Sequence, residues 1–82
     1  MFHHVKKVIP MTDYVLLVQF TDDTEKRYDV KPLLNEIPAF KPLFYVQGLF
    51  EQVKVDTGGF GISWNDGIDL SCNELYDNGK VP

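Results

Sequence analysis

The fold of this chain is decided by the stretch Gly58-Gly-Phe-Gly-Ile-Ser-Trp-Asn-Asp-Gly-Ile-Asp-Leu70. It holds four of the 6 glycines and the only tryptophan, with a short apolar run on each side of Asn65-Asp66-Gly67. Apolar runs around such a turn are typical of a β-hairpin, in which the Asp-Gly pair takes a positive φ. We therefore predict a hairpin whose first strand places Phe60, Ile62 and Trp64 on one face.

A helix-start signal follows this hairpin directly. Ser71-Cys72-Asn73-Glu74 matches a capping box, in which Ser71 is the N-cap and the Glu74 side chain reaches back to it. The helix then carries Leu75 and Tyr76 and ends near Asn78-Gly79. Because it is so short, packing against a sheet has to hold it.

The first part of the chain alternates like strands. We predict strands over residues 4–10, 14–20 and 25–30, with a hairpin loop over residues 21–24. In the second strand one face carries Tyr14, Leu16, Val18 and Phe20, and the other carries Val15, Leu17 and Gln19. Both faces are largely apolar, so this strand is either central in the sheet or backed by a helix or by a second copy of the protein.

Three prolines between residues 32 and 42 exclude a long helix and predict short helical pieces beginning at Pro32 and Pro42. The apolar residues of this region are expected to form a lid over the sheet; they are Leu33, Leu34, Ile37, Phe40, Leu43, Phe44, Leu49 and Phe50. Residues 51–57 alternate again, with Val53 and Val55 inward. The class is α+β, with one small, mainly antiparallel sheet of about five to six strands. A short interrupted helical segment between strands 3 and 4 and a short C-terminal helix complete it.

Composition predicts a single domain over residues 1–82 in the cytoplasm. Cys72 is the only cysteine, so no disulfide framework exists, and no apolar run has the length of a membrane span. The net charge is −4, and it lies entirely in residues 42–82, because acidic and basic groups balance in residues 1–41. We expect no direct nucleic-acid binding, since no basic face is present, and no membrane partner.

The acidic residues and histidines of the sequence could in principle bind a metal ion. Asp56, Asp66 and Asp69 have the oxygen ligands of a hard cation, but turn and outward strand positions explain them better. Neighbouring His3 and His4 point to opposite faces of a strand, which disfavours a shared zinc ion. We therefore predict no metal, no cofactor and no enzymatic activity.

Neither Cys72 nor the glycine-rich segment indicates a catalytic or phosphate-binding site. Cys72 lies in a helix first turn, which favours a thiolate, but it lacks a neighbouring base and is expected to be unreactive. Gly58-Gly59-Phe60-Gly61 lacks the Gly-Lys-Ser/Thr ending of a phosphate loop.

Motifs along nearly the whole chain, over residues 4–77, resemble the bacterial domain of unknown function 2442 family. The matching motifs are Leu16-x-Val18-x-Phe20-x-Asp22, Tyr28-Asp29-Val30, Pro32-Leu33-Leu34, Phe50, Val53-x-Val55-Asp56, Ile62-x-Trp64-x-Asp66-Gly67-x-Asp69-Leu70 and Glu74-Leu75-Tyr76. The most specific part is the Trp64 to Leu70 segment with Leu75-Tyr76. Asp23 is a departure, because the family usually has glycine there; aspartate tolerates the left-handed backbone at modest cost.

The resemblance implies a small α+β domain of three strands, a helical piece and a further strand pair. It also implies an association with helix-turn-helix domains in regulator-like proteins, and with small neighbouring proteins in pairs that look like toxin–antitoxin systems. It assigns no catalytic residues to this sequence.

Three functional hypotheses follow. The first is a protein-interaction domain, the antitoxin-like or accessory partner of a small basic protein, which binds through the acidic C-terminal half. The second is a homodimer built on Val15 and Leu17 or on a sheet edge. The third is a small-molecule binder with a pocket beside Trp64. The candidate interaction or signature residues are Trp64, Asp66, Asp69, Glu74, Tyr76, Val15 and Leu17.

Overall fold

The structure, a computed structural model, describes residues 3–82. Its first half is a three-stranded antiparallel sheet in the order β1-β2-β3, formed by β1 (Val5–Pro10), β2 (Val15–Phe20) and β3 (Glu25–Asp29). A short 3-10 turn, η1 (Thr12–Tyr14), joins β1 to β2. The predicted loop over residues 21–24 joins β2 to β3, and Asp23 there has a φ of 68°, the left-handed conformation expected of it. These three strands confirm the sequence-based prediction.

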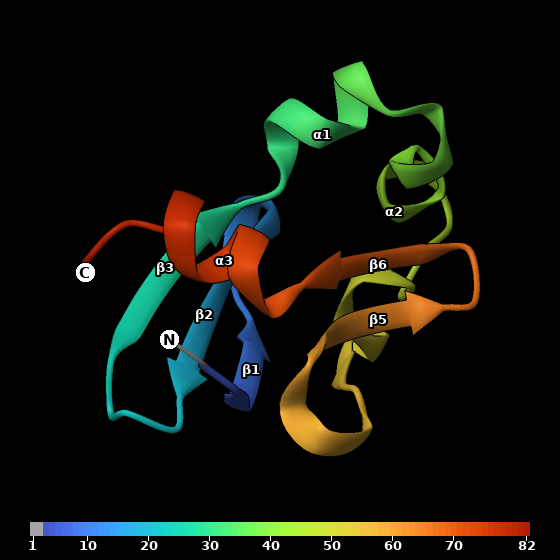
Figure 1. Cartoon of the computed structure of the whole chain (residues 1–82). Helices are drawn as coiled ribbons and strands as arrows, with labels where there is room; N and C mark the ends of the chain where they lie inside the picture. The colour runs from blue at the N-terminus through green and yellow to red at the C-terminus, as the bar shows by residue number, and fades with distance from the viewer. Residues whose placement is uncertain (1–2) are drawn as a thin grey trace.

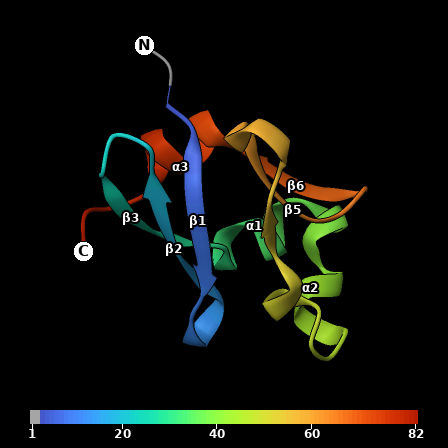
Figure 2. The same cartoon turned by 90° about the horizontal axis from the view of Figure 1, so that it is seen from below.

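The second half forms its own antiparallel sheet in the order β4-β5-β6. Its strands are β4 (Lys54–Val55), β5 (Gly61–Asn65) and β6 (Ile68–Ser71), and η4 (Thr57–Gly59) precedes β5. The prediction of one sheet of five to six strands is therefore wrong in this respect: the strands form two separate sheets. β1 and β4 lie alongside one another (Figure 2), but no ladder of hydrogen bonds joins them within the described residues.

Short helical pieces connect and cover the sheets (Figure 1). The proline-rich region forms α1 (Lys31–Glu36), η2 (Pro38–Phe40), α2 (Pro42–Tyr45) and η3 (Phe50–Gln52), in agreement with the predicted starts at Pro32 and Pro42. The last helix, α3 (Cys72–Asn78), lies against β3, β5 and β6. The class is α+β, as predicted.

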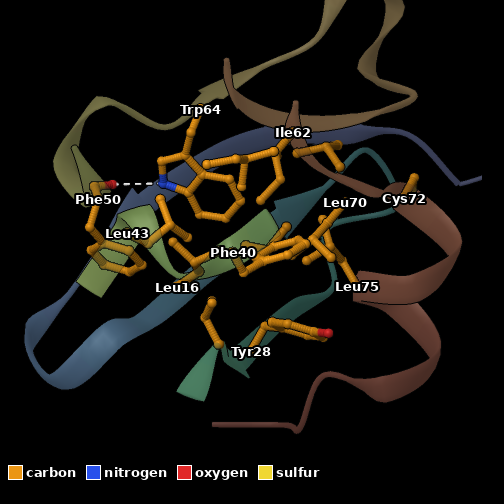
Figure 3. Close-up of a cluster of buried hydrophobic side chains, with 14 of the residues drawn as sticks. Leu16, Tyr28, Phe40, Leu43, Phe50, Ile62, Trp64, Leu70, Cys72 and Leu75 are labelled. Atoms are coloured by element: carbon orange, nitrogen blue, oxygen red, sulfur yellow. Dashed lines mark hydrogen bonds between the residues drawn. The ribbon is translucent and has the colours of Figure 1, made fainter. Parts of the chain in front are cut away.

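The side chains between these elements form the hydrophobic core (Figure 3). Leu16, Val18 and Phe20 of β2 are fully buried, as their shared strand face predicts. Four of the predicted lid residues are also buried: Leu34, Phe40, Leu43 and Phe50. Three predictions fail here, because Ile37 is 40%, Phe44 66% and Phe60 69% exposed. Phe60 precedes β5 in a helical backbone conformation, so it does not share the strand face of Ile62 and Trp64.

The hairpin turn is present but its backbone differs from the prediction. The glycines with positive φ in the described chain are Gly48, Gly58 and Gly59, so Gly67 does not need that conformation. The Asn65 side chain instead accepts a hydrogen bond from the Gly67 N–H at 2.8 Å. The register of β5 and β6 also shifts between Ser63 and Asn65, which makes Trp64 the extra residue of a β-bulge.

Candidate functional site

Trp64, the most distinctive residue of the sequence, belongs to the core. It is 5% exposed, and its indole Nε1 donates a hydrogen bond to the Phe50 carbonyl at 2.9 Å. Its ring stacks on Phe50 and meets the edge of Phe40. Trp64 is not among the residues that line four hollows found on residues 3–82. We therefore do not place a small-molecule pocket beside Trp64.

Glu74 is also used internally. The Ser71 side chain accepts a hydrogen bond from the Glu74 N–H at 3.1 Å, which confirms Ser71 as the N-cap. The other half of the predicted capping box is wrong, because the Glu74 carboxylate accepts a hydrogen bond from the Tyr28 hydroxyl at 2.8 Å instead. Burial, and then this carboxylate, raise the pKa of Tyr28 well above its usual value. The pair joins α3 to β3.

Tyr76 anchors the N-terminal segment. Its ring stacks on His3 with centroids 3.5 Å apart, and its hydroxyl donates to Asp22 at 3.0 Å. The ammonium of Lys26, a residue of β3, lies 4.2 Å from the centroid of the Tyr76 ring. These contacts join α3, the β2–β3 loop and residue 3, so Tyr76 has a structural role.

Cys72 is buried and its thiol donates to the His3 carbonyl at 3.2 Å. Burial, and then the charges of Asp22 and Asp77, raise the pKa of this thiol. Within residues 3–82 no group of three or more His, Cys, Asp or Glu side chains is arranged to hold a metal ion.

Val15 and Leu17 lie on the outer face of the first sheet, as predicted. Leu17 is flanked by Ile9 on β1 and Arg27 on β3, and Val15 faces Asp29. Both side chains are half-buried. The charged residues Arg27 and Asp29 of β3 border this face.

The sequence-predicted aspartates lie on or beside the second hairpin. Ser63 lies opposite Asp69 in the ladder, and its hydroxyl donates to the Asp56 carboxylate at 2.6 Å. Asp56 and Asp69 therefore flank one serine on the face that points away from the core. Asp66 lies at the tip of the same hairpin, and Asp66 and Asp69 are exposed. We call Asp56, Asp66 and Asp69 the acidic hairpin face; Lys54, opposite Ser63, is the basic residue of the same row.

A second surface was missed by sequence reasoning. Among the described residues, seven large hydrophobic side chains are exposed, and four of them line one hollow beside α2. These four, Met11, Phe44, Tyr45 and Val46, are called the α2 surface. Tyr45 is 70% exposed. Exposed aromatic residues gathered in one place are typical of protein-interaction surfaces.

Two hollows flank the α2 surface, and Phe44 and Tyr45 line both. The hollow of about 450 Å³ also has Asp13, Tyr14 and Glu51 in its wall; we call it the acidic hollow. The hollow of about 370 Å³ has Lys31 and Lys41; we call it the lysine hollow. The two hollows thus carry opposite charges on either side of one aromatic pair.

The backbone beside the acidic hollow is strained. Asp13 and Tyr14 have φ values of 63° and 59°, which residues other than glycine rarely adopt. Lys31 holds this turn: its ammonium donates to the Asp13 carbonyl at 2.6 Å and lies 3.1 Å from the Asp13 carboxylate. The Tyr14 ring lies against Phe44 and Phe50.

The fold and these surfaces define a small α+β domain with two antiparallel sheets and two uncovered faces, one acidic and one aromatic. The chain belongs to the family described as "Protein of unknown function (DUF2442)", whose sequence model matches residues 5–81. No curated protein and no solved structure matches it. None of the helices in residues 3–82 is long and apolar enough to cross a membrane.

Proposed function

We propose that this chain is a non-enzymatic protein-interaction domain that docks a small basic protein on its acidic hairpin face. The observation that supports this most is the exposure of Asp66 and Asp69 on a face that the rest of the domain leaves uncovered. Asp56, on the same face, is oriented by Ser63. Carboxylates on an uncovered face attract basic groups of a partner and set its orientation.

The distribution of charge supports the same proposal. The whole excess of negative charge lies in residues 42–82, which include all three aspartates of the face. A basic partner is steered toward such a surface, and the association weakens as salt screens the charges. The role we propose is therefore antitoxin-like or accessory, with the cytoplasm as the compartment.

The experiment is capture of the partner with the tagged chain from its source cells at low salt. The wild-type chain should retain one basic protein in a fixed ratio, and high salt should release it. The Asp66→Asn/Asp69→Asn variant should lose this protein. A matched control, Asp23→Asn/Glu36→Gln, changes the net charge equally at exposed positions elsewhere and should retain it.

Two results would overturn the proposal. One is the absence of any basic protein in the low-salt capture. The other is equal retention by the wild-type chain and by Asp66→Asn/Asp69→Asn.

A further inference from the structure

We propose that the α2 surface seats a second copy of this chain across a twofold axis. This inference concerns a different face from the acidic hairpin face and does not depend on the proposed function. It also uses a different face from a dimer built on Val15 and Leu17. Those two side chains are half-buried, whereas the residues of the α2 surface are exposed.

The centre of the proposed interface is aromatic. Phe44 and Tyr45 are 66% and 70% exposed, although both belong to a structured helix, α2. Aromatic side chains contribute the most area for the least conformational entropy when two proteins associate. Covering these two exposed rings with a partner would therefore remove a large apolar area from water.

Charged side chains on the two flanks of the interface favour a second copy of the chain as the partner. Lys41 lies in the wall of one hollow and Glu51 in the wall of the other. Within residues 3–82 neither side chain forms an ion pair, whereas Lys31 and Asp13 pair with each other. Each copy thus presents one unpaired positive and one unpaired negative group on opposite sides of the same aromatic pair.

A twofold axis through that pair makes the charged groups of the two copies complementary. In an isologous interface residue i of one copy meets residue j of the other, and j meets i. Rotation about the axis places the lysine hollow of each copy against the acidic hollow of the other. Lys41 of one copy then faces Glu51 of the other, twice, and the aromatic pair of each copy meets the aromatic pair of its partner.

The strained turn supports the same surface. Two of the three non-glycine residues with positive φ in the described chain, Asp13 and Tyr14, belong to the wall of the acidic hollow. Backbone strain of this kind persists where the surroundings hold it, and it concentrates at functional sites. Lys31 stabilises this turn through its contacts with Asp13, so the wall of the acidic hollow is preformed.

The test is sedimentation equilibrium of the full chain over a series of concentrations up to the millimolar range. The wild-type chain should rise from 9.4 kDa toward twice that mass. Tyr45→Ser should remain monomeric with an unchanged unfolding midpoint, and Phe44→Ser should also remain monomeric. Phe60→Ser, which removes an equally exposed aromatic residue outside the surface, and Leu17→Ser should still dimerise.

Charge exchange tests the symmetry itself. Lys41→Glu and Glu51→Lys should each weaken the dimer by about tenfold or more, because each brings like charges together twice. An equimolar mixture of these two variants should associate, since both cross-copy pairs become complementary again. The double variant Lys41→Glu/Glu51→Lys should also recover dimerisation.

Three results would overturn the inference. The first is a monomer at every concentration, and the second is a dimer that survives Tyr45→Ser. The third is a pair of single charge variants that fail to associate when mixed while the wild-type chain dimerises.

Discussion

The indole N–H of Trp64 donates to the backbone carbonyl of Phe50 at 2.9 Å, and the two rings stack with centroids 6.1 Å apart. This contact joins the second hairpin to the end of the proline-rich region (Figure 3). The hairpin that is most distinctive in the sequence is therefore fastened to the core by its own tryptophan. The contact therefore gives Trp64 a role in building the fold.

Replacement of Trp64 should damage stability before it affects any binding. We expect Trp64→Ala to lower the free energy of unfolding by about 3–5 kcal/mol, since it empties a buried aromatic site. Trp64→Phe keeps most of the volume but leaves the Phe50 carbonyl without its donor, which should cost about 1–3 kcal/mol. Urea denaturation followed by circular dichroism measures both. A Trp64→Ala variant as stable as the wild-type chain would contradict the assignment of Trp64 to the core.

Two glycines of the same hairpin should respond differently to a methyl group. A Cβ on Gly61 would lie 2.5 Å from the Leu70 carbonyl oxygen, within the β5–β6 ladder, whereas a Cβ on Gly67 meets nothing closer than 3.6 Å. Gly61→Ala should therefore cost roughly 1–3 kcal/mol, as overpacked sites do. Gly67→Ala is the matched control and should change stability little. Equal losses in thermal unfolding midpoint for both variants would contradict this structure of the turn.

Tyr28 should make the domain sensitive to alkaline pH. Burial and the Glu74 carboxylate raise its pKa above 10.0, so the folded state holds the phenol proton more tightly than the unfolded state. This stabilisation is complete below the unfolded pKa and is lost as the pH rises above about 10. The free energy of unfolding should fall more steeply with pH in the wild-type chain than in Tyr28→Phe. Parallel curves for the two proteins above pH 10 would show that Tyr28 ionises freely.

Cys72 should react slowly while the domain is folded. Burial raises the pKa of its thiol, and the nearby Asp22 and Asp77 charges act in the same direction, so the thiolate is scarce at neutral pH. A thiol reagent at pH 8 should modify the native protein far more slowly than the protein in urea. A native rate close to the unfolded rate would mean that Cys72 is accessible and that its contact with His3 opens readily.

Local features of this fold follow well from the residue types. Ser71 caps α3 because its hydroxyl replaces a missing backbone partner, and Pro32 and Pro42 lie in the first turns of α1 and α2 because their φ is already set. Asp23 takes the left-handed conformation that a short hairpin loop requires and that aspartate tolerates. These features depend on neighbours in the chain, so the sequence contains enough information to predict them.

Features that depend on distant residues were beyond prediction. Glu74 is bound by Tyr28, which is 46 residues earlier, so its capping role is lost to a tertiary contact. The division into two sheets depends on how β1 meets the two-residue strand β4, and periodicity within each strand carries no information on that pairing.

The two surfaces illustrate the same limit. An approach of Asp56, Asp66 and Asp69 was considered from the sequence, because these residues lie in or next to predicted strands and a turn. The exposure of Phe44 and Tyr45 was not, since apolar residues among prolines have no regular period that separates inward from outward positions. In an apolar segment without regular spacing, the sequence does not distinguish residues of an interaction surface from residues of the hydrophobic core.

The central claim is that the acidic hairpin face docks a basic protein, and titration calorimetry of the captured partner tests it most directly. At low salt, Asp66→Asn/Asp69→Asn should bind about tenfold more weakly than the wild-type chain, because two favourable surface charges are lost. The two affinities should converge as salt is raised. Equal affinities at low salt, with Asp23→Asn/Glu36→Gln as the control, would contradict the claim.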